Sequence, residues 1–161
     1  MLSVPFSAES PACRGIRHLS WRIHYDCILF ALRAWPPDFG DGGLVSRDST
    51  YPVWRAGADA ATMLRTGADL DIAGLNVPAG TYTLYVLVED PENWKLIINN
   101  QSGQNGDSYD PSVDLGRVDM EMEKPPVPVE NLKYTITTKG DTGKLQLEWE
   151  NHIASVSFRA N

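Results

Sequence analysis

The chain has 161 residues, of which 42% are hydrophobic and 22% are charged. That length suits one domain with a sizeable core, and that composition is typical of a folded globular protein rather than a disordered one. The 21 acidic residues outnumber the 14 basic ones, so the formal net charge is -7. A net negative charge without a basic stripe argues against nucleic acid as a partner, because its phosphates would be repelled.

Two kinds of targeting segment are not expected. No apolar run approaches the roughly 20 residues that cross a bilayer, so we predict no transmembrane segment. Residues 1–10 lack the basic leader and the long apolar stretch of a signal peptide. The chain alone therefore leaves its compartment open.

Residues 1–50 differ in composition from the rest of the chain. They contain five Arg and no Lys, together with both cysteines and two of the three histidines. They show no sustained helical or strand period, so we predict an irregular segment. We hypothesise that it is mistranslated or poorly ordered, and that a folded domain spans residues 51–161. An intact related reading frame upstream in the locus would support this hypothesis, and an unbroken expressed frame would contradict it.

One potential metal site lies in this first segment. Cys13, His18, His24 and Cys27 offer four atoms that bind zinc. Their spacing lacks the close Cys-x-x-Cys or His-x-x-x-His pairs that let a small knuckle grip the ion. We therefore expect no metal site here and no cofactor.

The clearest strand pattern in the chain covers residues 81–89. Its side chains alternate with period two and are apolar on both faces, which predicts a central strand covered on both sides. A polar loop follows, and then a second run over residues 94–98. Two such runs joined by a short polar loop predict an antiparallel hairpin.

Short segments upstream of this hairpin also favour strands. Residues 62–66 and 70–73 are two short candidates divided by Gly67. A competing interpretation places a helix over residues 60–65 with Asp59 as its N-cap. We prefer strands because the segment is short and leads directly into more strand pattern.

The remaining chain continues the alternation after a turn-rich polar loop. Residues 115–123, 132–137, 145–150 and 154–158 each predict a strand, and the prolines near residue 126 predict an extended crossing. About eight strands with short turns and no long helix predict an all-β fold. We expect an antiparallel β-sandwich, jelly-roll-like in its connections, because each strand must bury one face against a second sheet.

Two groups of acidic residues invite functional interpretations. Asp107 and Asp110 lie in the polar loop of residues 101–112, but their spacing does not match a calcium-binding loop, and a solvated loop is the better interpretation. Glu148 and Glu150 share one face of a predicted strand, as a catalytic pair would. Adjacent acids opposite a buried row are more often surface residues than glycosidase carboxylates.

The best candidate for a binding site is Trp54, Arg55 and Asp59. An indole stacks on sugars or aromatic ligands, the planar guanidinium of Arg binds carboxylate or phosphate, and Asp pairs with either. The alternative interpretation places Trp54 in the core and makes Arg55 and Asp59 an ion pair that fixes a loop. His152 has no accompanying nucleophile motif, so we assign no catalytic residue.

Four segments together resemble a known family. Residues 53–62, 77–84, 94–99 and 147–151 are similar to the bacterial domain of unknown function (DUF) family 2911, in order and spacing, over about residues 51–159. The resemblance implies a β-rich protein that is periplasmic or secreted. No activity is established for the family, so the resemblance implies no mechanism. The segment before residue 51 departs from the family pattern.

Three functions stay open on this sequence. The leading one is a non-catalytic extracytoplasmic binding or interaction module for a glycan, a small acidic ligand or a protein. The second is a carboxylate-dependent hydrolase with a cleft that joins Asp59 to Glu148 or to another acid, the two acids lying about 5–10 Å apart. The third is a purely structural accessory domain, which burial of Trp54 together with a paired Arg55 would favour.

Overall fold

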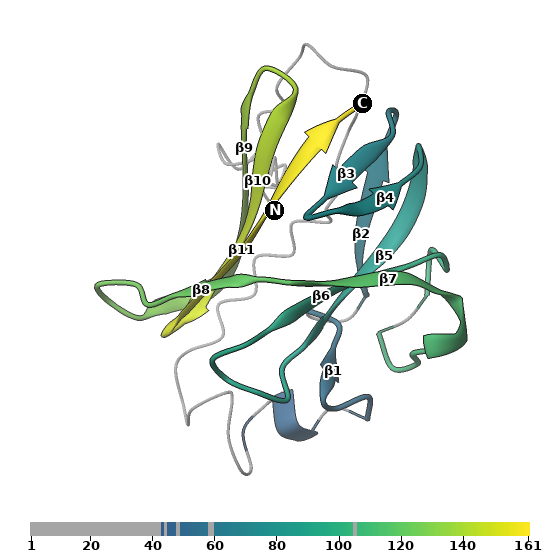
Figure 1. Ribbon diagram of the computed structural model, residues 1–161. Coiled ribbons are helices and arrows are strands. Elements are labelled where there is room, and N and C mark those ends of the chain that lie inside the picture. The colour runs from purple at the N-terminus through teal and green to yellow at the C-terminus, as the bar shows by residue number, and fades with distance from the viewer. Residues whose placement is uncertain (1–42, 44, 48, 58–59, 105) are drawn as a thin grey trace, which may run out of the picture.

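The structure is a computed structural model that describes residues 43, 45–47, 49–57, 60–104 and 106–161 (Figure 1). Within these residues the chain forms eleven β-strands and two short 3-10 helices, arranged in two antiparallel sheets. The predicted all-β antiparallel fold is confirmed. None of the helices in the described residues has the length and apolar character that crossing a membrane requires. The four potential zinc ligands lie outside the described residues.

The first sheet is built around the strand that the sequence marks most clearly. Its strands run in the order β1-β5-β6-β7, and β2 also pairs with β5. The predicted hairpin is confirmed, because β5 and β6 pair in antiparallel register from Thr83 opposite Asn99 to Leu87 opposite Lys95. The strands of this sheet are β1 (Val53–Trp54), β2 (Thr62–Thr66), β5 (Gly80–Leu87), β6 (Lys95–Asn99) and β7 (Asp114–Asp119).

The second sheet contains the three longest strands. Its order is β4-β3-β11-β10-β9, and β8 also pairs with β11. The predicted strands near the C-terminus are confirmed, and they form two successive hairpins. The strands of this sheet are β3 (Leu70–Ile72), β4 (Leu75–Val77), β8 (Glu121–Glu123), β9 (Val129–Lys139), β10 (Thr142–Glu150) and β11 (His152–Ala160).

The preferred interpretation of residues 62–66 as a strand is confirmed, because they form β2 and pair with β5, and the competing helix over residues 60–65 is absent. One predicted element differs from the structure. The single strand over residues 115–123 is divided at Met120 into β7 and β8, which pair with different sheets. Figure 1 shows β7 and β8 as one long ribbon across the molecule. The alternation continues through Met120, so sequence periodicity alone gives no sign that the partner strand changes.

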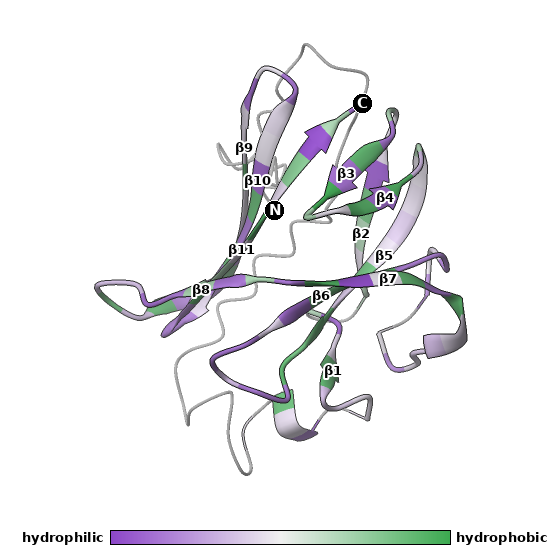
Figure 2. Ribbon diagram, viewed as in Figure 1, coloured by the Kyte–Doolittle hydropathy of each residue, from purple (hydrophilic) through white to green (hydrophobic). Residues whose placement is uncertain are grey.

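The main core lies between the two sheets. It is formed by the inward side chains of β5 and β6 on one side and of β10 and β11 on the other. Figure 2 shows that the strands of both sheets carry hydrophobic as well as hydrophilic residues. Val45, from the 3-10 helix Val45–Arg47, also belongs to this core and is only 2% exposed. Val45 therefore packs into the same core as the strands, although it precedes residue 51.

The outward face of the first sheet is also buried. Tyr85 and Ile97 lie on it fully buried, in a second hydrophobic cluster with Val53 and Ala61. Tyr109 packs against this cluster from the loop of residues 100–113, of which residue 105 is not described. We call this the covered face. It confirms the prediction that β5 is a central strand covered on both sides.

Candidate functional site

The structure places Trp54 inside the core. Strand β1 pairs with β5 so that Trp54 lies opposite Val86, and its side chain is only 4% exposed. Its ring stacks on Trp149 with centroids 5.1 Å apart and meets the edge of Trp94 at 6.2 Å. This is the arrangement that the structural interpretation of Trp54 predicts, since a buried indole has no free face for a ligand.

Arg55 follows Trp54 in the chain and forms an ion pair with Asp107, a residue of the 100–113 loop. Its Nη1 atom lies 3.4 Å from Oδ1 of Asp107, and its Nε donates to the carbonyl of Gly57 at 3.4 Å. Asp107 is 81% exposed, so solvent screens this pair. Asp59 lies outside the described residues, and its pairing with Arg55 stays a prediction.

A polar network attaches the 100–113 loop to the covered face. Tyr109 donates to Oδ2 of Asp114 at 2.5 Å, and Arg117 donates to both groups, at 2.8 Å to Tyr109 and 2.9 Å to Asp114. Asn99 donates to the other oxygen of Asp114 at 2.9 Å. Burial and then the bond to Asp114 raise the pKa of Tyr109 to about 12. These groups satisfy one another, so they hold the loop in place.

Further hydrogen bonds connect the loop to the strands beneath it. Thr83 donates to the carbonyl of Gln101 at 2.7 Å, and Tyr85 donates to the carbonyl of Ser108 at 3.1 Å. Asp110 caps the turn at Ser112. Among the described residues no group of three His, Cys, Asp or Glu side chains could hold a metal ion.

The two glutamates at the end of β10 have different surroundings. Glu148 accepts from Lys133 at 3.1 Å and from Gln146 at 3.0 Å. The register with β9 shifts between Glu148 and Glu150. Glu150 is the last residue of β10 and has a φ of 48°, so the strand ends and the chain turns at this residue.

His152 follows this turn and joins the aromatic cluster. Its ring stacks on Trp94 with centroids 4.9 Å apart. Burial lowers its pKa, an effect that Glu150 opposes and Lys124 reinforces. Its contacts identify it as one layer of the stack that includes Trp94.

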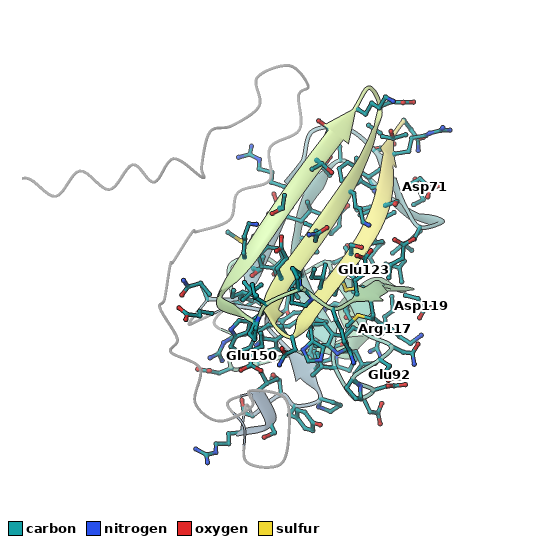
Figure 3. The ribbon with its side chains drawn as sticks, turned by 90° about the vertical axis from the view of Figure 1, so that its left-hand side faces the viewer. Asp71, Glu92, Arg117, Asp119, Glu123 and Glu150 are labelled. Carbon is teal, nitrogen blue, oxygen red and sulfur yellow. The ribbon has the colours of Figure 1, made fainter. Side chains whose placement is uncertain are left out.

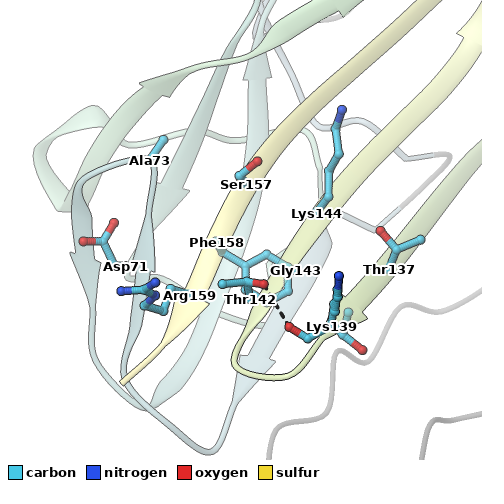
Figure 4. A pocket seen from close by; sticks show the side chains of 11 residues that line it. Asp71, Ala73, Thr137, Lys139, Thr142, Gly143, Lys144, Ser157, Phe158 and Arg159 are labelled. Carbon is cyan, nitrogen blue, oxygen red and sulfur yellow. Dashed lines mark hydrogen bonds between the residues drawn. The ribbon is translucent and has the colours of Figure 1, made fainter.

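A shallow depression lies on the outward face of the second sheet, which we call the open face (Figure 4). Its volume is about 600 Å³. The cross-strand register builds it from two rows of outward side chains. One row contains Lys139, Thr142, Arg159 and Asp71, and the other contains Thr137, Lys144 and Ser157.

The depression is locally basic in a chain whose net charge is -7. Three cations, Lys139, Lys144 and Arg159, line it with one acid, Asp71. Two of the cations have exposed acidic neighbours outside the lining: Lys144 lies 3.4 Å from Glu121, and Arg159 lies 3.8 Å from Asp141. Exposed ion pairs of this kind contribute about 0–1 kcal/mol, so a ligand carboxylate can replace the acidic partner.

Other acidic residues lie further along the molecule. Figure 3 shows Asp71, which lines the depression, towards one end of the sheet, and Glu150 towards the other. No motif in the sequence indicates the depression. The sequence shows Lys and Thr alternating with apolar residues along the predicted strands, but this alternation does not predict the cross-strand register that brings those side chains together.

These features define a class of protein: an antiparallel β-sandwich with one outward face covered by its own loop and the other left open by the described residues. A family model described as a protein of unknown function (DUF2911) matches residues 39–158, and the chain belongs to this family. The match confirms the resemblance, although it begins at residue 39 rather than 51. Comparison with curated proteins found no match, and neither did comparison with solved structures.

Proposed function

We propose that this domain is a non-catalytic binding module for a small acidic ligand or an acidic glycan, and that the depression on the open face is its binding surface. The observation that carries the proposal is the grouping of Lys139, Lys144 and Arg159 around one hollow of about 600 Å³. Charge-assisted hydrogen bonds from such cations to a carboxylate are stronger than neutral ones. Long-range repulsion by the acidic chain is screened at physiological ionic strength beyond about 8 Å.

Isothermal titration calorimetry on the full chain tests this proposal. We expect a carboxylated sugar to bind, and Arg159→Ala to weaken binding by about tenfold, because one charge-assisted hydrogen bond is lost. Lys133→Ala is the matched control, since Lys133 is an exposed cation of the same sheet that pairs with Glu148 and does not line the depression. Equal effects of the two variants, or no binding, would contradict the proposal.

A structural accessory role is the second candidate. The buried Trp54 and the pairing of Arg55 with Asp107 support it, because both side chains are engaged within the domain. In that case no acidic ligand binds at the open face. The hydrolase alternative pairs Asp59, which lies outside the described residues, with Glu148 or another acid, and Glu148 is engaged by Lys133 and Gln146. The described residues therefore give it no support.

We also propose that the domain acts outside the cytoplasm, in the periplasm or after secretion. The family resemblance supports this proposal. Fractionation of cells that produce the native protein tests it. Recovery in the periplasmic or secreted fraction is the expected result, and recovery with the cytoplasmic enzymes would contradict it.

A further inference from the structure

We infer that the ligand of the open face is a sugar acid, in which one carboxylate is attached to a ring with several hydroxyl groups, as in a uronate. This inference rests on the proposed function and narrows it from acidic ligands in general. It follows from three features of the depression: a sheet floor whose backbone donors do not point into it, an acid among the cations, and hydroxyl side chains between them.

The floor of the depression restricts which anions suit it. Phosphate sites in proteins are commonly built from free backbone N–H groups at helix N-termini or in nests. Here the floor is formed by β10 and by β9 and β11 on either side, which pair with β10 from residue 142 to residue 148. The N–H groups of the central strand β10 are engaged in the ladder, and those of the edge strand β9 that have no partner point along the sheet, away from the depression. A ligand on this face is therefore held by side chains.

Asp71 is the feature that separates a sugar acid from a compact polyanion. It lies directly opposite Arg159 in the pairing of β3 with β11. A carboxylate at that position repels a doubly charged phosphate but accepts hydrogen bonds from sugar hydroxyls. Its Oδ1 atom accepts from the backbone N–H of Gly74 at 2.7 Å, which fixes the side chain at the edge of the depression.

Hydroxyl groups occupy the space between the charged side chains. Ser157 and Thr137 flank Lys144 on the neighbouring strands, and Thr142 lies between Lys139 and Arg159. Thr142 donates to the carbonyl of Lys139 at 2.9 Å, so its oxygen is oriented to accept from a ligand (Figure 4). Adjacent strands are about 5 Å apart, so one row offers a cation, a hydroxyl, a second cation and an acid at that spacing.

This arrangement matches the groups of a sugar acid. The carboxylate is bound by Lys139, Lys144 or Arg159, and the ring hydroxyls donate to Asp71 and exchange hydrogen bonds with the hydroxyl side chains. Neutral sugars lack the charged contact, and inorganic phosphate has only one or two hydroxyl donors and a higher negative charge, which Asp71 repels. The depression therefore favours a ligand that carries both kinds of group.

Calorimetry on the full chain with four probes tests the inference: D-galacturonate, D-glucuronate, D-galactose and inorganic phosphate. We expect at least one uronate to bind about tenfold more tightly than galactose and than phosphate. Asp71→Asn should weaken binding of that uronate by about fivefold and leave phosphate binding equal or stronger. Asparagine retains the oxygen that accepts from Gly74, so the variant preserves the turn.

The outcomes separate this inference from the proposed function. If phosphate binds more tightly than both uronates, and Arg159→Ala abolishes its binding, the face binds acidic ligands but the sugar-acid inference is wrong. If a uronate binds and Asp71→Asn leaves its affinity unchanged, the role of Asp71 is wrong and the inference fails. If none of the four probes binds, both the inference and the proposed function are contradicted.

Discussion

The two outward faces of this sandwich are built from the same strand alternation and have opposite environments. On the covered face, Tyr85 and Ile97 are completely buried beneath the 100–113 loop. On the open face, the equivalent outward positions hold residues such as Lys144 and Ser157, and a depression of about 600 Å³ remains. The first face is closed by the chain itself, and the described residues leave the second uncovered at the depression.

The difference shows what decides whether a loop covers a sheet. Outward apolar side chains gain free energy when a loop removes them from water, at roughly 25 cal/mol per Å² of apolar surface. Outward lysines and hydroxyls offer no such gain and lose hydration when covered. The 100–113 loop therefore covers the first sheet, and the polar outward side chains of the second sheet stay in contact with water.

The largest expected effect compares one isoleucine on each face. Ile97→Ala should lower the free energy of unfolding by about 2–5 kcal/mol, because it leaves a cavity beneath the loop. Ile153 is a half-buried residue of β11 on the open face, and Ile153→Ala should lower the free energy of unfolding by less than about 1 kcal/mol. Urea denaturation of both variants measures the difference, and equal losses would contradict the distinction between the faces.

The next effect concerns the network that holds the loop. Asp114→Asn should destabilise the domain by about 1–3 kcal/mol, because it weakens the bonds with Tyr109 and Arg117 in a partly buried site. Hydrogen exchange should accelerate in the loop. Asp119→Asn is the control, because Asp119 lies on β7 like Asp114 but is exposed. Loss of its ion pair with Lys95 of β6 should lower the free energy of unfolding by less than about 1 kcal/mol. Unchanged loop exchange in Asp114→Asn would show that the network does not hold the loop.

A smaller effect should appear at alkaline pH. The pKa of Tyr109 is about 12 in the folded protein against a reference value of 10.0, so the folded state holds this proton more tightly than the unfolded state. The corresponding stability is present below the unfolded pKa and is lost as pH rises towards 12. Tyr109→Phe should reduce the loss of stability in this range. An identical pH dependence of the urea midpoint in the variant would contradict this prediction.

The smallest effect sharpens the description of the open face. Glu121→Gln removes the exposed acid that pairs with Lys144, so a bound uronate should gain about two- to fivefold in affinity. Glu123→Gln, on the same strand, serves as the control for a general change in net charge. Equal gains in the two variants would indicate that long-range charge, rather than release of Lys144, determines the affinity.

The alternation in the sequence predicted the fold well because period two reports which residues face a core. It identified the strand at residues 81–89, its hairpin partner and the strands near the C-terminus. It did not identify β1 or β4, which are too short to show a period. The sequence also shows no sign of the change of partner strand at Met120, because the inward positions Val118, Met120 and Met122 continue with period two from β7 into β8.

The site was less predictable than the fold. Trp54 and Arg55 attracted attention by residue type, but whether an indole is a platform or part of a core depends on what packs on it. Asp71, Lys144 and Arg159 are far apart in the sequence and meet only through the pairing of β3, β10 and β11. That register is a tertiary property, and one sequence does not specify it.

An NMR titration of the isotopically labelled full chain with D-galacturonate, or with D-glucuronate if calorimetry shows that it binds more tightly, tests the central claim most directly. Amide shifts should change at residues 71, 137–144 and 157–159, with little change at residues 53–57 and 106–117. Shifts concentrated around Trp54, Arg55 and the 100–113 loop, or no shifts at saturating uronate, would contradict the assignment of ligand binding to the open face.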